Sequence, residues 1–324
     1  MKIPRAQARG IFVFAFVTAT LMVLAGFLLN RPAQRQPANS SPSPSIDVVY
    51  QYPMNDAQFQ SNLRAAYSVK ALTPEQMRRL GSVTNRSQIY IDGCHSNQGL
   101  AIPTQACVFG DLKSSKAIWL VGDSHAAQWF VALNDFALNH HYRLVTRTMS
   151  SCPFLLGVPK LAGRAEPYWQ CQTHNTWLAG KIASENPAVV IAAGYSGIQS
   201  TNLDATLRAM PLLGTPTTKV VILGDTPKPR GAVLDCLRAN VKAVRNCFAT
   251  SDSVGAIDFA SKVAAEAKKL GFGYLRLTDW FCQNPKCPAV IAGRIIYAQG
   301  THISTEAQQY FESRMESSLL NLLR

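Results

Sequence analysis

Residues 117–125 read Ala117-Ile118-Trp119-Leu120-Val121-Gly122-Asp123-Ser124-His125, an apolar run followed at once by small polar residues. The run predicts a buried β-strand, and the residues after it predict the start of a helix. A serine at such a junction is by itself more often a helix cap than a nucleophile. Here, however, Ser124 lies where its hydroxyl can attack an ester carbonyl while free N–H groups of the helix start donate to the developing oxyanion.

Short apolar runs alternate with longer amphipathic ones after this stretch. We expect strands at 118–121, 143–148, 188–193, 219–223 and 274–277, and helices at 126–139, 168–184, 203–210, 256–270 and 305–323. Such alternation is typical of an α/β protein with a parallel sheet covered on both faces. Ser124 then lies at the carboxyl edge of the sheet, and His302, just before the last helix, is delivered to the same edge.

The N-terminal stretch is of a different kind. No charge interrupts the sequence from Ile11 to Leu29, a length that can cross a hydrocarbon core of about 30 Å. Lys2, Arg5 and Arg9 precede it, which favours a cytoplasmic N-terminus and an exported remainder. A cleaved signal peptide is the alternative, although its apolar core usually spans only about 7 to 15 residues.

We therefore divide the chain into four segments. They are a cytoplasmic N-terminus with one transmembrane anchor (1–30), a Pro/Ser-rich linker (31–46), an extension packed on the catalytic domain (47–116) and that domain (117–324). Within the extension, the sequence around Thr73 and Pro74 predicts a capped short helix.

If the chain is exported, its eight cysteines are expected to form disulfide bonds, because the compartment outside the cytosol is oxidising. Sequence does not fix the connectivity, and neighbours along the chain are the economical assignment: Cys94–Cys107, Cys152–Cys171, Cys236–Cys247 and Cys282–Cys287. The alternative is a zinc site built from the last four cysteines, but their spacing lacks the tight two-residue intervals of zinc ribbons and fingers. We expect no metal and no cofactor.

The formal net charge is +13, of which the first 35 residues carry +5. An excess of positive charge suits an anionic envelope glycan or a phospholipid surface. The charges are scattered, however, so a soluble basic surface explains them better. Nucleic-acid binding has no motif behind it and conflicts with export.

Four features together resemble a known family. They are the Gly122-Asp123-Ser124-His125 block, the preceding Cys94/Cys107 segment, Ser150-Ser151-Cys152-Pro153, and the closing Cys282, Cys287, Tyr297 and His302-Ile303-Ser304. They resemble the SGNH-type (GDSL-like) domains fused to membrane acyltransferase-3 proteins. The resemblance covers roughly residues 89–324 and implies a flavodoxin-like, three-layer α/β/α SGNH-hydrolase fold.

What the resemblance implies is an exported domain that moves acyl groups, usually acetyl, onto an envelope polysaccharide. With its single predicted span, the chain would sit in the bacterial inner membrane with its catalytic domain in the periplasm or outside the cell. A separate membrane acyl-donor protein would supply the acyl group. A carbohydrate or acyl esterase is the alternative enzyme, because transferase and hydrolase share one acyl-enzyme and differ in whether water is excluded.

The resemblance also assigns site residues. Ser124 would be the nucleophile and His302 the general base. The N–H of Ser124 and a backbone amide near Ser150 and Ser151 would donate to the oxyanion, and Tyr195 would line the acyl pocket.

One position departs from the family pattern. Three residues before His302, where the family has an aspartate, this chain has Gln299. Losing that charge costs a serine protease about 10⁴ in rate. Three hypotheses remain open: Asp225 or Asp279 substitutes for the acid, Gln299 or a backbone carbonyl orients His302, or the domain is catalytically impaired and binds envelope glycan.

Overall fold

The computed structural model describes residues 55–324 except 104, 106, 162–163, 230 and 252–253. The chain divides into two units, Met1–Tyr50 and Gln51–Arg324, and everything described below belongs to the second. The predicted anchor (1–30) and linker (31–46) lie outside the described residues. Among those that are described, no helix is both long enough and apolar enough to cross a membrane.

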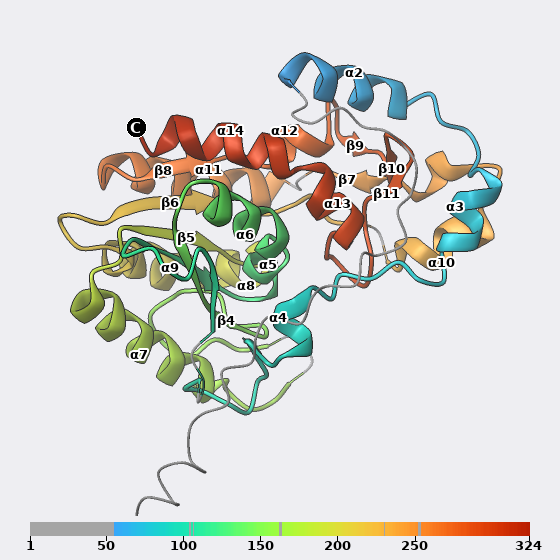
Figure 1. Cartoon of the computed structure of the whole chain (residues 1–324). Helices are drawn as coiled ribbons and strands as arrows, with labels where there is room; N and C mark the ends of the chain where they lie inside the picture. Colours follow the sequence, from blue (N-terminus) through green and yellow to red (C-terminus); the bar gives the residue numbers. More distant parts are fainter. Residues whose placement is uncertain (1–54, 104, 106, 162–163, 230, 252–253) are drawn as a thin grey trace, which may run out of the picture. The chain divides into compact units, whose positions relative to one another are not determined.

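A mostly parallel sheet forms the centre of the described part (Figure 1). Its strands lie in the order β1-β4-β3-β5-β6-β8, with β2 also paired to β4. Its strands are β1 (His95–Ser96), β2 (Val108–Gly110), β3 (Ala117–Gly122), β4 (Arg143–Met149), β5 (Val189–Ala193), β6 (Lys219–Leu223) and β8 (Gly273–Leu275). Only β2 runs antiparallel within this sheet. Taken in chain order, β3, β4, β5, β6 and β8 are the first to fifth of these parallel strands. Across the sheet they lie in the order second, first, third, fourth, fifth, which is the flavodoxin-like order. In that topology ligands bind at the carboxyl edge, here beside β3.

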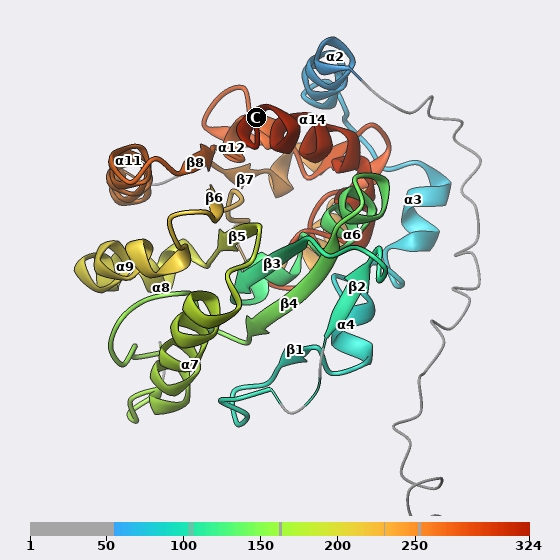
Figure 2. The same ribbon diagram turned by 60° about the vertical axis from the view of Figure 1, so that its left-hand side comes forward.

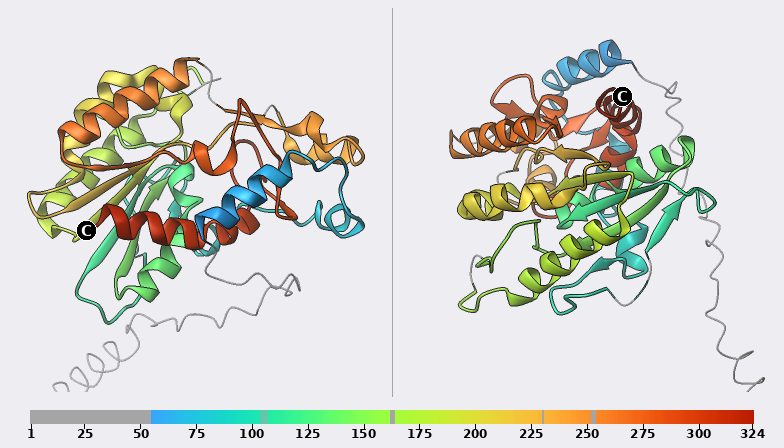
Figure 3. Two further views of the ribbon diagram at one scale, coloured as in Figure 1. Left: turned by 90° about the horizontal axis from the view of Figure 1, so that it is seen from above. Right: turned by 90° about the vertical axis from the view of Figure 1, so that its left-hand side faces the viewer.

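Helices cover both faces of the sheet (Figure 3). One face carries α7 (Trp169–Glu185), α9 (Leu203–Ala209) and α11 (Val254–Lys269), and the other carries α6 (Phe130–Asn139) and α14 (Glu312–Leu322). The predicted three-layer α/β/α arrangement is thus confirmed. Two predicted helices are interrupted: 126–139 is divided between α5 (Ser124–Ala127) and α6, and 305–323 between α13 (Thr305–Tyr310) and α14.

Shorter elements complete the described part. They are α2 (Asp56–Ala66), α3 (Pro74–Arg79), α4 (Gln88–Ile91), α8 (Ser196–Gln199), α10 (Val233–Ala239), α12 (Thr278–Phe281), 3₁₀ turns at Ser200–Asn202, Met210–Leu213 and Val244–Cys247, and the strand pairs β7 (Ala249–Thr250) with β9 (Lys286–Cys287) and β10 (Val290–Ile291) with β11 (Arg294–Ile295).

The core on the α7, α9 and α11 face follows from strand alternation. Val121, Val190 and Ile222 point to this face from β3, β5 and β6 and pack with Ile182 of α7 and Val263 of α11. Burying each such side chain contributes about 1.5–3 kcal/mol. This packing fixes the strand ends, and therefore the carboxyl edge from which the site is built.

The described residues of 55–116 contact the rest of the second unit at several points. The β1 and β2 strands pair with β4, so this part of the predicted extension takes part in the sheet, as the view in Figure 2 shows. On α2, Phe59 packs edge-on against Tyr310 with ring centroids 5.2 Å apart.

Thr73 and Gln76 form a capping box on α3, which confirms the predicted cap.

Four disulfide bonds join the cysteines in the neighbouring pairs expected from the sequence: Cys94–Cys107, Cys152–Cys171, Cys236–Cys247 and Cys282–Cys287. The zinc alternative is wrong, because all four of its cysteines are used in disulfides.

Two carboxyl groups face each other between α6 and α14. Asp135 and Glu312 are hydrogen-bonded, which requires a shared proton, and Glu316 and Arg294 lie near them. Burial and the charge of Asp135 raise the pKa of Glu312 to about 8. Because this folded-state pKa lies above the unfolded value, the pair's contribution to stability is complete below about pH 4.5 and is lost as pH rises towards 8.

We therefore expect Glu312→Gln to reduce the loss of thermal stability between pH 5 and 8, since its amide cannot titrate. The difference in melting temperature should reach several degrees, because 1 kcal/mol moves it by about 2–4 °C in a domain of this size. Calorimetry across that pH range measures it, with the exposed Glu185→Gln as control. Parallel pH curves for the wild type and Glu312→Gln would refute the shared proton.

Candidate active site

The end of β3 approaches the end of β5 so closely that only glycine fits. Gly122 has φ +130°, and a Cβ there would lie 1.8 Å from the carbonyl oxygen of Ala193. Ser124 follows as the first residue of α5 and is partly exposed. The predicted location of Ser124, at a strand-to-helix junction on the carboxyl edge of the sheet, is therefore confirmed.

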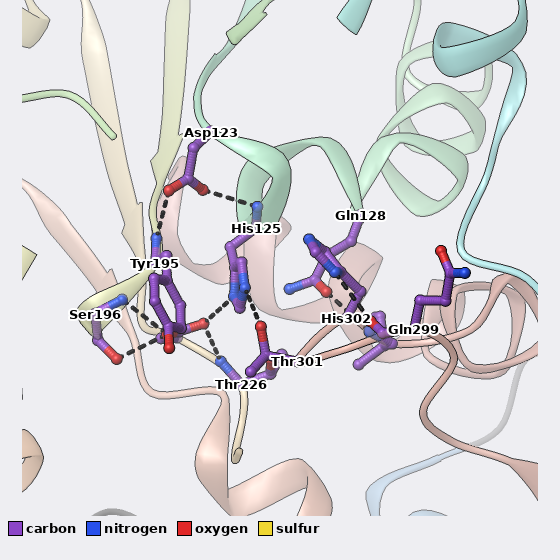
Figure 4. A network of polar contacts seen from close by, with 11 residues as sticks. Asp123, His125, Gln128, Tyr195, Ser196, Thr226, Gln299, Thr301 and His302 are labelled. Carbon is purple, nitrogen blue, oxygen red and sulfur yellow. Dashed lines mark hydrogen bonds and ion pairs between the residues drawn. The ribbon is translucent and has the colours of Figure 1, made fainter. Parts of the chain in front are cut away.

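Asp123 fixes the turn that carries Ser124. Its Oδ1 accepts from the N–H of His125 at 2.8 Å, which caps α5, and its Oδ2 accepts from the N–H of Tyr195 at 2.9 Å, as Figure 4 shows. Asp123 is fully buried, so these two donors take the place of water. The carboxylate joins the ends of β3 and β5 and is structural.

His302 lies on a tight hairpin between β11 and α13. Tyr297 and Ile303 form an antiparallel bridge, and the N–H of Ala298 donates to the carbonyl of His302 at 3.0 Å. The N–H of Ile303 donates to the side-chain oxygen of Gln128 at 2.9 Å. Gln128 stands four residues after Ser124, on the same side of the helical turn, so this bond brings the hairpin to the serine's element.

The ring of His302 is oriented by the main chain. Its Nδ1 lies 3.1 Å from the carbonyl oxygen of Gln299. A carbonyl only accepts, so Nδ1 carries the proton and Nε2 of the neutral ring has a free lone pair. Nε2 is buried and, within the part of the chain that the structure describes, has no hydrogen-bond partner. Such a ring is prepared to take a proton at Nε2.

The side chain of Gln299 plays no part in that contact. The residue is exposed, and the main-chain carbonyl is the atom that meets His302 (Figure 4). Ser124 and His302 are not hydrogen-bonded to each other among the described residues, since Nε2 of His302 has no partner there. Catalytic hydrogen bonds often tighten only when substrate is bound.

The two acids proposed from sequence lie in different surroundings. Asp279 is 64% exposed on α12 and pairs with Arg276 at 3.4 Å. Asp225, after β6, is buried and meets His125, with Oδ1 2.5 Å from Nδ1. The ring of His125 in turn lies beside that of His302, with centroids 4.9 Å apart. Asp225 therefore reaches the site through a second histidine, His125, to which no sequence pattern had pointed.

The pKa values follow from these contacts. Burial and the charge of His125 lower the pKa of His302 to about 4. Burial alone would lower the pKa of His125 and raise that of Asp225, but their mutual charge and hydrogen bond raise the first and lower the second. His125 and Asp225 therefore form a buried ion pair beside a neutral His302.

The predicted oxyanion donors follow β4. The N–H of Ser150 donates to the carbonyl of Ser96, so that amide is engaged in strand pairing. Ser151 has φ +55°, a left-handed conformation that is uncommon for residues other than glycine, and its hydroxyl accepts from Gln98 at 3.1 Å. Its N–H remains the candidate second donor.

Tyr195 follows β5 and lies at the same edge. Its ring packs on His125 with centroids 4.8 Å apart, and the ammonium of Lys228 lies 4.4 Å from its centroid. A cavity of about 50 Å³ is lined by Asp225 and by Gly194 and Ser196, the neighbours of Tyr195, but not by Tyr195 itself. In this structure Tyr195 packs on the ion pair.

A further histidine, His95 of β1, was missed by sequence reasoning. Its two ring nitrogens meet the hydroxyls of Thr148 and Ser150 at 2.9 and 3.0 Å, and the ring of Tyr90 lies 4.6 Å away. Burial and the charge of His302 lower its pKa to about 3, so His95 is neutral. No sequence signal marked it, because a two-residue strand shows no periodicity.

Metal binding finds no support in the described ranges, where no group of three or more His, Cys, Asp or Glu residues could hold an ion.

Comparisons with known proteins give one family. A family model described as "SGNH domain (fused to AT3 domains)" matches residues 93–317. No match was found among curated proteins.

Several solved structures also match this chain. The periplasmic domain of a lipopolysaccharide acetyltransferase from Salmonella ser. Paratyphi A is 16% identical, with a TM-score of 0.50 over 65% of this chain and 86% of that one. A putative arylesterase from Agrobacterium tumefaciens and the carbohydrate acetylesterase Est24 from Sinorhizobium meliloti are each 12% identical. They have TM-scores of 0.41 and 0.40, cover 64% of this chain, and are themselves covered at 99% and 100%.

We expect Gln299→Ala to leave turnover of an acetyl ester within about twofold of wild type, because the main-chain carbonyl that accepts from His302 is retained. Steady-state kinetics measure this. A loss of tenfold or more in Gln299→Ala, with the protein folded, would show that the side chain does the orienting.

The acid limb of the pH dependence of kcat/KM should lie near pH 4, below the usual histidine value of about 6.5. As pH falls through 4, His302 takes up a proton and can no longer act as base. Acetate release between pH 3 and 8 measures the limb, with circular dichroism to confirm folding at each pH. A limb near 6.5 would contradict the described environment of His302.

Proposed function

The chain belongs to the family of SGNH domains found fused to AT3 domains, and from this premise we propose that it is a serine-dependent O-acyltransferase that acetylates a cell-envelope polysaccharide. The observation that carries the proposal is the state of His302. Its Nδ1 is bound by a carbonyl, and its buried Nε2 is unpartnered among the described residues, beside the residue that follows Ser124.

The first half-reaction forms an acyl-serine. Nε2 of His302 takes the proton of the Ser124 hydroxyl as Oγ attacks the acyl carbonyl. The N–H groups of Ser124 and Ser151 donate to the oxyanion. Collapse of the tetrahedral intermediate breaks the bond to the donor's leaving group, which receives the proton from the His302 imidazolium.

The second half-reaction reverses these roles. A sugar hydroxyl replaces the leaving group, His302 takes its proton, and the sugar oxygen attacks the acyl-serine carbonyl. Collapse transfers the acyl group to the sugar and returns the proton from His302 to Ser124. If water enters in place of the sugar, the same steps give an esterase, so acceptor binding decides between transferase and hydrolase.

The acyl donor and the location are part of the proposal. Family members are fused to AT3 domains, which supports a separate membrane protein of that kind as donor for this chain. Four disulfides suit an oxidising compartment outside the cytosol. The uncharged stretch 11–29 would anchor the chain, and the role of the similar Salmonella domain suggests lipopolysaccharide-type acceptors.

We expect the oxidised full-length chain to hydrolyse or transfer acetyl from a chromogenic ester, and Ser124→Ala to lose at least about 10³-fold in kcat. Mass spectrometry of acid-quenched protein should show one added acetyl group, localised to Ser124. The exposed Ser200→Ala is the matched control and should retain the wild-type rate.

Three outcomes separate the candidate functions. Turnover that rises with added acceptor sugar identifies a transferase, and turnover indifferent to it identifies an esterase. No acylation of Ser124 by any activated ester, in a folded protein that still binds glycan, identifies the catalytically impaired binding module.

A further inference from the structure

A chain of three side chains crosses the site beside His302. Asp225 Oδ1 lies 2.5 Å from Nδ1 of His125, and Nε2 of His125 lies 2.9 Å from the hydroxyl of Thr301 (Figure 4). The side chains of His125 and Asp225 are only 3% and 8% exposed. A carboxylate only accepts, so Nδ1 is protonated, and the charged ring then donates from Nε2 to Thr301.

The carboxylate at the start of this chain is saturated with donors. Its Oδ2 accepts from the N–H and the hydroxyl of Ser196 at 2.8 and 2.7 Å, and its Oδ1 also accepts from the N–H of Thr226 at 2.8 Å. These bonds hold Asp225 to α8 and to its own strand end. The position of His125 is therefore set by the sheet rather than by the hairpin it touches.

Stability alone does not explain such a pair. Taking two charges out of water costs several kcal/mol per ion, and replacing a buried ion pair by apolar residues of similar volume is often neutral or stabilising. A buried pair is better explained where its geometry serves a specific role. Here that role is indicated by Thr301, the residue to which Nε2 of His125 is hydrogen-bonded.

The hydrogen-bond partner of His125 Nε2, Thr301, is the residue before the proposed base, His302. Thr301 precedes His302 on the Tyr297–Ile303 hairpin, and Ile303 on the other side is held by Gln128 at 2.9 Å. His302 is thus flanked by two side-chain bonds, both reaching from the turn that begins at Ser124. The His125 ring also packs directly on that of His302.

We propose that the buried His125–Asp225 pair, acting through Thr301 and through the ring contact, is the positioning element for His302 and takes over the positional role of the carboxylate absent at position 299. The inference rests on the proposed function for its kinetic consequences, but its geometry does not. Asp225 fixes the His125 ring, His125 holds the hairpin through Thr301, and the Gln299 carbonyl sets the tautomer of His302.

The pair also sets the electrostatics of His302. The charged groups near His125 are Asp123, Asp225 and Lys228. Those near His302 are His125 and Asp225, and neutral His95 also interacts with it. Removing the imidazolium while keeping Asp225 deletes the repulsive charge and leaves the attractive one. The pKa of His302 must then rise from about 4 towards its usual 6.5.

The experiment has two arms on the full-length oxidised chain. In the first, the His302 imidazole is titrated by NMR in wild type, in His125→Gln and in the exposed control His141→Gln, which requires no activity. We expect the pKa of His302 to rise in His125→Gln and to stay unchanged in His141→Gln. An unchanged value in His125→Gln, with the fold retained, overturns the electrostatic coupling.

In the second arm, kcat and KM are measured for Thr301→Val, Thr301→Ser and the exposed control Thr173→Val. Thr301→Val should lower kcat about 10- to 100-fold with KM unchanged, as for one hydrogen bond to a charged group, and Thr301→Ser should restore it. Wild-type kcat in Thr301→Val, or no rescue by Ser, overturns the positioning role.

The two arms also separate this inference from the proposed function. If Ser124→Ala keeps full turnover, or no turnover occurs at all, the proposed function fails while the NMR titration still decides whether His125 controls His302. If Ser124→Ala is inactive but both arms give wild-type values, the function stands and the positioning inference fails.

Discussion

The ion pair between His125 and Asp225 is the interaction on which the arrangement of the site depends. Asp225 is held by donors from α8 and from the strand end that follows β6, and His125 belongs to the turn that carries the proposed nucleophile. Through Thr301 the pair reaches the hairpin of the proposed base. One buried network thus joins His125 and Thr301, which are more than 170 residues apart along the chain. Because the network lies in a region of low dielectric, each of its bonds is stronger than it would be in water and more costly to break.

The missing aspartate has two roles that this structure separates. In a serine triad the carboxylate holds the histidine tautomer and stabilises the imidazolium that forms during reaction. The main-chain carbonyl of Gln299 accepts from Nδ1 of His302, so the tautomer is held without a charge. The negative charge is present on Asp225, but a positive ring stands between it and His302. His302 is therefore a weak base that stays neutral in acid, and a weaker base drives proton removal less well at neutral pH.

The sequence was sufficient for those features that leave a pattern in it. Short apolar runs in β3, β5 and β6 indicated parallel strands, and the Gly122-Asp123-Ser124 block indicated the junction at the carboxyl edge. The strands β1 and β2 were missed, because the residues around them show neither alternation nor a long apolar run. The contact of His125 with Asp225 was missed for a different reason. The residues are 100 positions apart, and each type is common at helix starts and strand ends.

The role of position 299 was the least accessible to sequence, and the reason is general. A side chain is written in the sequence, but a backbone carbonyl is present at every residue, so an acceptor of that kind leaves no signature. What determines it here is the hairpin: the bridge between Tyr297 and Ile303 and the positive φ of Gly300 turn the Gln299 carbonyl towards His302. The side chain of Gln299 is exposed and takes no part in orienting the ring. A chain built in this way can lose the aspartate at 299 and still keep its histidine in the tautomer that catalysis requires, provided that the hairpin is held by the buried pair behind it.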